Sequence, residues 1–463
     1  MAPVVVGGPD GGRHYTLHTV PRSFWVETLG CPKNQVDSDK LTGTLLTDGL
    51  VPADSADSAD LVVVNTCAFV EEAREESVAT ILAIDEDRLD GSRLVVTGCM
   101  AERYGDELSE ALPEVDTVAG FGVPISLTTK PSNPLSATGE SVPLLDLLNL
   151  PRPRSERPWA YVKVAEGCDK ACGFCAIPSF RGPQRSRSID SILTEVVELD
   201  AREIVLIAQD LAAYGRDQGV GQKSIVPLVE AISAHVDWVR LLYLYPSELT
   251  DPLIELMATG PVPYFDLSLQ HVSAPLVRRM RRWGNGAKYM ERIEQIRAVR
   301  PDAVFRSNFI VGYPGATEAD HDALLAFVDE AQLDWCGFFS YSTEDGTYAA
   351  ALSGEVDPGL MHDRLAELRE LQDDITATRR DALIGTELLV LVDEPGVARS
   401  HREAPEIDGI IVVPEDLTVG EFHVVHVVDA EGPDLHAVPV HPTAALTERV
   451  ADGPELLRTP GVG

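Results

Sequence analysis

The stretch EGCDKACGFCAIPSFRG, residues 166–182, places three cysteines close together near the middle of the chain. Cys168, Cys172 and Cys175 are separated by three and then two residues. Three thiolates cannot complete the tetrahedral shell of a structural zinc ion, but they can hold a metal group that keeps one coordination position open. The apolar run WAYVKVAEGC, which leads into the motif, is typical of a β-strand. The sequence therefore predicts an open metal site at the end of a strand.

Outward from this motif, residues 158–384 repeat a strand-and-helix pattern. Apolar runs such as EIVLIAQD (203–210) alternate with helical patterns such as AKYMERIEQIRAV (287–299). A Thr-x-x-Asp sequence at Thr317 resembles a capping box, which marks the start of another helix. Repeated units of this kind predict a parallel βα barrel. We count about six strands, fewer than the eight of a full barrel, so a full and a partial barrel both stay open.

Three further cysteines follow strand-like runs in residues 23–125. The runs FWVETLGC, LVVVNTC and RLVVTGC end at Cys31, Cys67 and Cys99, 36 and then 32 residues apart, which is close to one βα unit each. Helical patterns follow the first two runs. Because the carboxyl ends of parallel strands share one edge of a sheet, these three thiols are expected to converge.

The remaining segments have a different composition. Pro- and Ser-rich residues predict a linker, and short strands separated by turns near the carboxyl end predict a small β-barrel. The predicted fold is α/β, with an N-terminal parallel sheet, a central βα barrel or partial barrel and a C-terminal β-barrel. The predicted divisions are a tail (1–22), an N-terminal domain (23–125), a linker (126–157), a central domain (158–384), a C-terminal domain (385–447) and a second tail (448–463).

Composition limits the class of protein. The formal net charge is −36, which disfavours binding to the phosphates of nucleic acid and favours a basic partner or simply solubility. No apolar run is long enough for a membrane span, and the amino terminus lacks the pattern of a signal peptide. We therefore expect a cytosolic protein that has no membrane as a partner. Seven cysteines in such a chain argue against a disulfide framework. The seventh, Cys336, is expected to be a buried free thiol.

Thiolates are the usual ligands of iron–sulfur clusters. Three cysteines on a four-iron cluster would leave one iron free to bind a chelating ligand. Zinc is the main alternative, but no His, Cys, Asp or Glu stands at finger-like spacing after Cys175. The residues therefore favour a cluster with one open iron.

The motif CDKACGFC (168–175) resembles the signature of the radical S-adenosylmethionine family. This resemblance implies that the open iron binds S-adenosylmethionine and that reductive cleavage gives a deoxyadenosyl radical. Phe174 matches an aromatic position near the adenine. NFIVGYPG resembles a later strand motif of the family, in which Gly312 and Gly315 allow close approach of the backbone to the cofactor. Asn308 stands where many members have Gly or Asp.

The whole arrangement, from about residue 23 to 447, resembles the methylthiotransferases within that family. The resemblance implies two four-iron clusters, the second held by Cys31, Cys67 and Cys99 and involved in sulfur delivery. It also implies a C-terminal TRAM-like module that presents the substrate, and an electron donor such as flavodoxin or ferredoxin. No catalytic residue beyond these ligands follows from the motifs.

Two branches of the methylthiotransferases compete. The MiaB-type branch modifies an adenosine in transfer RNA, and the RimO-type branch modifies an aspartate of small-subunit ribosomal protein twelve. The stretches LGCPKNQVDSDKLTG, NTCAFVEEAREESVATI, LIAQDLAAYGRD and YSTEDGTYAA look like the RimO-type branch. This resemblance implies that a methylthio group is added to the β-carbon of the aspartate, whose unactivated C–H bond calls for radical chemistry rather than a side-chain base.

The charge of the C-terminal module favours the same branch. Residues 386–446 contain twelve acidic and two basic residues, the latter Arg399 and Arg402. This balance repels transfer RNA and suits a basic ribosomal protein, free or in the ribosome, so nucleic acid is not expected to be the primary partner. The alternative is a merely solvated surface, or a ribosome-binding factor with inert clusters. Arg306, in FRSNFIVG, is the candidate for gripping the target aspartate.

Overall fold

The computed structural model describes residues 22–126, 146–219 and 225–440. Its N-terminal unit is a parallel five-stranded sheet in the order β2-β1-β3-β4-β5. The strands β3 and β4 are rich in Val and buried along almost their whole length, as expected for a parallel sheet covered on both faces. The elements are β1 (Ser23–Thr28), α1 (Pro32–Thr47), β2 (Val51–Pro52), β3 (Leu61–Thr66), α2 (Glu71–Asp87), β4 (Arg93–Gly98), α3 (Cys99–Ala111) and β5 (Thr117–Val118).

The central unit contains the six predicted strands, arranged as two three-stranded parallel sheets, β10-β9-β6 and β11-β12-β13. A parallel bridge between Leu244 and Leu267 connects the two sheets, so the described strands form a partial barrel. The strands are β6 (Trp159–Lys163), β9 (Glu203–Ile207), β10 (Trp238–Leu241), β11 (Tyr264–Gln270), β12 (Val304–Val311) and β13 (Trp335–Ser340), and a short antiparallel pair, β7 (Ala165–Glu166) and β8 (Arg185–Ser186), lies beside them.

Residues alternate between the two faces of the central strands. One face, with Val162, Leu206 and Phe265, packs against the surrounding helices. Thr317 caps α10 and forms the predicted capping box with Asp320. The helices are α4 (Ile177–Arg181), α5 (Ile189–Leu199), α6 (Ile225–Ser233), α7 (Asp251–Thr259), α8 (Ala274–Arg279), α9 (Gly286–Val299), α10 (Glu318–Ala331) and α11 (Pro358–Asp381), with short 3-10 turns at 56–58, 147–149, 211–213, 216–218, 246–248 and 349–351.

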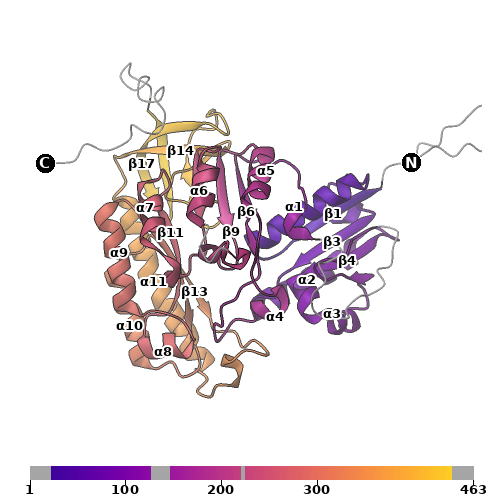
Figure 1. Cartoon of the computed structure of the whole chain (residues 1–463), viewed down its shortest axis with the longest axis horizontal. Helices are drawn as coiled ribbons and strands as arrows, with labels where there is room; N and C mark the ends of the chain where they lie inside the picture. The colour runs from indigo at the N-terminus through magenta and orange to yellow at the C-terminus, as the bar shows by residue number, and fades with distance from the viewer. Residues whose placement is uncertain (1–21, 127–145, 220–224, 441–463) are drawn as a thin grey trace, which may run out of the picture.

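The C-terminal unit is a closed five-stranded barrel that confirms the predicted small β-barrel. It contributes Leu391 and Ala404 to the apolar cluster on the second face of the central strands, beside Tyr161 and Tyr264. The barrel therefore covers one end of the central unit, while the N-terminal sheet lies at its side (Figure 1). Its strands are β14 (Glu387–Glu394), β15 (Val397–Arg399), β16 (Ile411–Val412), β17 (Phe422–Glu431) and β18 (Asp434–Pro439).

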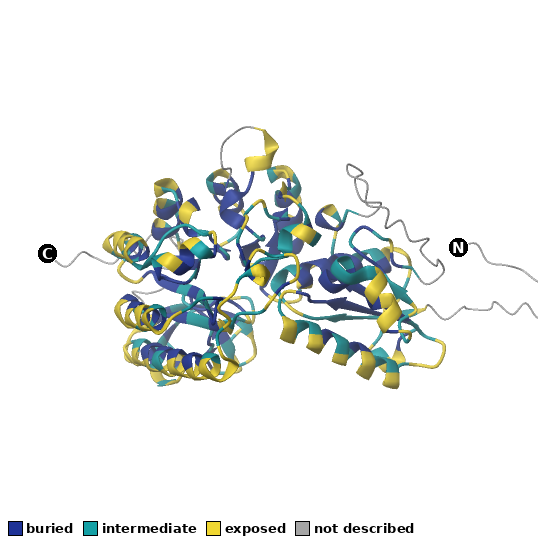
Figure 2. Cartoon of the chain, turned by 90° about the horizontal axis from the view of Figure 1, so that it is seen from below, coloured by how far each residue is buried: buried dark blue, intermediate teal, exposed yellow. Residues whose placement is uncertain are grey.

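Burial follows the same layers. The buried strands of the N-terminal and central units are dark blue in Figure 2, strands of the C-terminal barrel are only partly buried, and the helices show yellow outer faces. Cys336, on β13, is free and partly buried against the helix-facing core. Within the described ranges, no helix combines the length and the apolar character needed to cross a bilayer.

The predicted linker connects two units through its described end. The Lys40 ammonium donates to the carbonyl of Leu148 at 2.6 Å, and Arg152 pairs with Asp39 and Glu195, both at 2.9 Å. These contacts attach the chain before β6 to α1 on one side and α5 on the other. The predicted tails, except residue 22, and linker residues 127–145 lie outside the described residues.

Candidate functional site

The first three cysteines stand at the carboxyl ends of neighbouring strands. Cys31 follows β1 and precedes α1, Cys67 follows β3, and Cys99 follows β4 and opens α3. Gly30 has φ +94°, and a Cβ there would lie 2.8 Å from the Cβ of Cys67, so the two loops approach too closely for a larger residue. Burial, together with the neighbouring Cys99 and Cys31 thiols, raises the pKa of Cys67 to about 12. The three cysteines thus share the carboxyl edge of one parallel sheet, and their convergence on one cluster stays a prediction.

The second triplet lies in the loop after β6 and β7. Backbone hydrogen bonds fold this loop: Cys168 N–H donates to the carbonyl of Gly182 at 3.1 Å, and Gly173 N–H donates to the carbonyl of Met280 at 2.8 Å. Burial raises the pKa of Cys168 to about 11 and that of Cys175 to about 12, and the Cys172 thiol adds to both shifts. Thiolates in such surroundings need positive charge close by, which a metal cluster would supply.

Each triplet has an arginine directed at a sulfur atom. Arg181 Nη2 donates to Cys99 Sγ at 2.9 Å, and Arg282 Nη1 donates to Cys172 Sγ at 3.2 Å. Hydrogen bonds to sulfur are a common feature of protein-bound iron–sulfur clusters. The donor sets therefore fit two clusters, and the assignment of one cluster to each triplet stays a prediction.

A buried charge network connects the two triplets. Arg181, on α4, bonds to Asp37 at 3.0 Å and to Glu166 at 3.1 Å, and Lys163 bonds to Glu166 at 2.7 Å and also to Asp37. Burial alone would raise the pKa of Glu166, but Arg181 and Lys163 outweigh it and lower that pKa to about 2. Glu166 stands two residues before Cys168, so the network fixes one cysteine loop against the other.

The predicted S-adenosylmethionine contacts are brought together only in part. Phe174 packs beside Tyr313 in a small apolar cluster. Gly312 and Gly315 follow β12 with φ of +84° and +85°, and Cβ atoms there would meet Met361 and Arg279. These positions need glycine for conformation and space, and their contact with a cofactor stays a prediction.

Arg306 lies in the middle of β12 and is already engaged. Its Nη1 bonds to Asp266 at 3.2 Å, and its Nε is 3.5 Å from Asp408 of the C-terminal barrel. Asp408 in turn accepts a hydrogen bond of 2.5 Å from the hydroxyl of Tyr264. Arg306 thus joins the inner face of the central strands to the C-terminal barrel, and its proposed grip on a substrate stays a prediction.

Several residues around the triplets were not predicted. Lys33 stands two residues after Cys31, and its Nζ lies 3.1 Å from the ring centroid of Tyr243. Burial lowers the pKa of Lys33, while Cys31 and Asp266 raise it, so these groups share one region. Near the other triplet, Lys170 and Arg282 both lie over the Tyr245 ring, at 4.4 and 4.2 Å. The sequence feature that could have pointed to Lys33 is the segment LGCPKN, in which Lys33 follows Cys31 by two residues.

Two amide oxygens on the central unit lack a partner. Oε1 of Gln209 and Oδ1 of Asn308 are buried and accept no hydrogen bond from the described residues. Gln209 follows β9 and donates to Glu166 at 2.7 Å, which places it beside the second triplet. Buried acceptors of this kind usually have a partner, so they fit a polar ligand that bears ammonium or hydroxyl donors.

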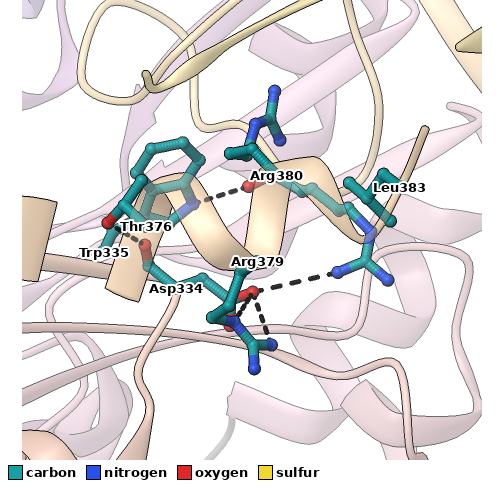
Figure 3. A pocket seen from close by; sticks show the side chains of 7 residues that line it. Asp334, Trp335, Thr376, Arg379, Arg380 and Leu383 are labelled. Carbon is teal, nitrogen blue, oxygen red and sulfur yellow. Dashed lines mark hydrogen bonds and ion pairs between the residues drawn. The ribbon is translucent and has the colours of Figure 1, made fainter. Parts of the chain in front are cut away.

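A small pocket lies elsewhere, where α11 and β13 meet the C-terminal barrel (Figure 3). Asp334 is 2.7 Å from Arg379 and 3.8 Å from Arg402, and the Trp335 indole donates to the carbonyl of Arg402 at 2.9 Å. These charges hold the domains together, and none of the six clustered cysteines lines the pocket. Among the described residues, no three His, Cys, Asp or Glu side chains are spaced to hold a single metal ion.

Comparison with known proteins defines first the class of protein. The radical SAM superfamily matches residues 162–328, the uncharacterized protein family UPF0004 matches residues 23–120, and the TRAM domain family matches residues 384–440. The chain is thus a radical SAM protein with an additional N-terminal domain and a TRAM domain. Membership of that superfamily implies a four-iron cluster and S-adenosylmethionine as cofactors.

Full-length relatives define the family within this class. The ribosomal protein uS12 methylthiotransferase RimO of Moorella thermoacetica is 42% identical over 84% of this chain and 93% of its own length, and that of Saccharopolyspora erythraea is 40% identical over 89% and 94%. A solved structure of the radical S-adenosylmethionine methyltransferase TsrM from Kitasatospora setae covers 76% of this chain and 91% of its own, at 14% identity and a TM-score of 0.45. The chain belongs to the RimO family of radical SAM methylthiotransferases.

Proposed function

We propose that this chain adds a methylthio group to the β-carbon of an aspartate of ribosomal protein uS12. The observation that carries the proposal is the similarity to RimO proteins along nearly their whole length. The geometry supports it, because two thiol triplets lie on either side of one buried charge network. A protein that only bound ribosomes would need neither triplet.

We further propose that Cys168, Cys172 and Cys175 hold the cluster with the open iron, and that Cys31, Cys67 and Cys99 hold a second cluster. When bound, these groups and S-adenosylmethionine supply the radical, the sulfur and the methyl group. The residues around them position the groups and exclude water. Arg181 and Arg282 donate to cysteine sulfurs, and the C-terminal barrel covers part of the inner face of the central strands, which limits the access of water.

The surface of the C-terminal barrel supports a basic protein as substrate. Its two arginines are used internally: Arg399 pairs with Glu203 at 2.8 Å and also with Asp393, and Arg402 faces Asp334. Eight of its acidic residues are exposed, so its outward charge is negative. They are Glu387, Glu394, Glu406, Glu415, Asp416, Glu421, Asp429 and Glu431.

Not all of the acidic residues counted in the sequence reach this surface. Glu403 is buried against Arg380, and Asp408 is buried against Tyr264 and Arg306. Asp393, too, is committed to Arg399. The number of charges available to a partner is therefore smaller than the composition indicates. We also propose a cytoplasmic location, because the substrate is a ribosomal protein, and a flavodoxin or ferredoxin as electron donor.

The test is a direct comparison of substrates. Purified protein, reconstituted anaerobically, is incubated with S-adenosylmethionine, a sulfide source and reductant, and with either uS12 or transfer RNA. Mass spectrometry is expected to find the methylthio group on one aspartate of uS12 and none on adenosine. Modification of transfer RNA alone would overturn the proposal, as would a normal modification of uS12 in cells that lack the gene.

A further inference from the structure

Lys33 occupies an unusual place between the N-terminal domain and the central unit. It lies in the first turn of α1, two residues after Cys31, and its side chain is partly exposed. Its ammonium group lies over the ring of Tyr243, which follows β10 on the inner side of the central strands. A cation on an aromatic face gains some stabilisation but is not neutralised.

The ring beneath Lys33 is held in place by a specific set of contacts. Tyr243 has φ +65°, a left-handed conformation that is uncommon for a bulky residue. Its N–H donates to Asp266 Oδ2 at 2.9 Å, and the other oxygen of Asp266 accepts from Arg306 at 3.2 Å. Strain of this kind persists where the surroundings fix it, and it gathers at functional sites.

The other cations of this region already have anionic partners. Lys163 and Arg181 bond to Asp37 and Glu166, and Arg306 bonds to Asp266. Among residues 22–126, 146–219 and 225–440, no carboxylate lies within ion-pair distance of Lys33 Nζ. A partly buried ammonium group that has no carboxylate partner of its own can pair with the carboxylate of a ligand.

We propose that Lys33 binds the side-chain carboxylate of the target aspartate. The inference rests on the proposed function, because it takes aspartate as the substrate. The β-carbon is bonded to the carboxyl carbon, so a carboxylate hydrogen-bonded to Nζ places the reacting carbon roughly 4 Å from Nζ. Because Cys31 is the N-cap residue of α1 and Lys33 lies in the first turn of that helix, the bound carboxylate stands at the same end of α1 as Cys31. Lys33 thereby positions the substrate and selects a carboxylate over an uncharged side chain.

The test measures discrimination between two peptides without turnover. Reconstituted holoenzyme, without reductant, is titrated with a uS12 peptide that contains the target aspartate and with the same peptide carrying Asn there. The wild type is expected to bind the Asp peptide roughly thirtyfold more tightly. Lys33→Met and Lys33→Gln are expected to lose this preference, whereas Lys33→Arg keeps most of it.

Lys288→Met is the matched control, because Lys288 also lies over an aromatic ring, 5.3 Å from the Trp283 centroid, but on the exposed face of α9. It is expected to keep the full preference. Iron content and thermal unfolding show which variants are folded, and either of the two neutral variants decides the question. An unchanged preference for Asp in such a variant overturns the inference, as does a wild type that binds both peptides equally.

The two proposals fail differently. If the wild type methylthiolates uS12 but its preference for Asp does not depend on Lys33, the role of Lys33 falls and the proposed function stands. If the wild type leaves uS12 unmodified and acts on transfer RNA, the proposed function falls and the inference about Lys33 falls with it.

Discussion

At the scale of single residues, two arginines that are distant in the sequence donate hydrogen bonds to two of the six clustered cysteines. Arg181 is 82 residues from Cys99, and Arg282 is 110 residues from Cys172. The cysteines could be predicted because each follows a strand or belongs to a compact motif. The arginines could not, because their contacts depend on how the domains and loops pack, and many arginines in a chain form surface pairs only. Tyr243 and Lys33 escaped prediction for the same reason.

The metal content tests the two triplets separately. The anaerobically reconstituted protein is expected to contain about eight irons per chain, from two four-iron clusters. Replacement of Cys168, Cys172 and Cys175 by Ala should halve that number and abolish cleavage of S-adenosylmethionine. Replacement of Cys31, Cys67 and Cys99 should also halve it but leave cleavage at least partly intact while sulfur insertion stops. Colorimetric iron determination and deoxyadenosine release measure both effects. An iron content that neither triple replacement changes would contradict the assignment.

The bond from Arg181 to Cys99 predicts an effect on the N-terminal cluster. A hydrogen bond from a cation to a ligand sulfur favours the more negative, reduced state, so it raises the reduction potential. Arg181→Lys is therefore expected to lower the midpoint potential of that cluster. An electron paramagnetic resonance titration measures the potential in protein whose Cys168, Cys172 and Cys175 are Ala. In the same background, Arg282→Lys serves as the control and should leave that potential unchanged, and equal potentials in both variants would contradict the prediction.

At the scale of elements, the parts that follow periodic patterns were predicted well. All six central strands, the helices after Cys31 and Cys67 and the capping box of α10 agree with the sequence analysis. The helix α3 was not predicted, because β4 ends at Gly98 with φ +93° and the chain enters the helix at the next residue, Cys99, without a loop to mark its start. The partial barrel could not be distinguished from a full one, because closure depends on how the sheets meet in space.

The loop after β13 contacts the N-terminal domain, and we expect this contact to set the distance between the two triplets. The buried carboxylate of Glu344 forms ion pairs with Arg74 of α2 at 2.8 Å and with Arg103 of α3 at 2.5 Å. Removal of one partner from a buried ion pair costs about 3–5 kcal/mol, and here two cations would be left without it. Glu344→Ala is therefore expected to weaken the docking of the N-terminal domain and to reduce methylthiolation at least tenfold.

Cleavage of S-adenosylmethionine without substrate separates this effect from general damage. It should stay close to the wild-type rate in Glu344→Ala, because the second triplet lies on the central unit. Glu355→Ala, an exposed residue farther along the same loop, is the control and should retain both activities. A variant of Glu344 that methylthiolates uS12 normally would show that the contact does not set the geometry of the site.

At the scale of the whole molecule, the acidic residues fall into two groups, buried carboxylates that pair with arginines and exposed carboxylates. The sequence alone does not show which residue belongs to which group. The chain has a net charge of −36, yet several of its acidic residues neutralise arginines at domain boundaries: Glu203 bonds to Arg240 at 2.7 Å and Arg399 at 2.8 Å, and Glu403 is buried against Arg380. These pairs hold the C-terminal barrel on the central unit. Only the remaining exposed carboxylates can act on a partner at a distance.

The exposed carboxylates of the C-terminal barrel are expected to steer uS12 toward the site. Replacement of Glu394, Glu415 and Asp416 by Lys should lower the association rate about tenfold at low salt, with a smaller effect on dissociation, because steering acts before contact. The difference should shrink as salt rises, since the screening length falls to about 8 Å at physiological ionic strength. Stopped-flow fluorescence with labelled uS12 measures both rates. Asp393 is excluded from this set because its bond to Arg399 is part of the fold.

The control replaces Glu255, Glu291 and Glu294, exposed residues on α7 and α9, by Lys. It makes the same change in net charge on helices of the central unit and should alter the association rate far less. If both triple variants slow association equally, the net charge of the molecule, and not the surface of the C-terminal barrel, attracts the basic partner.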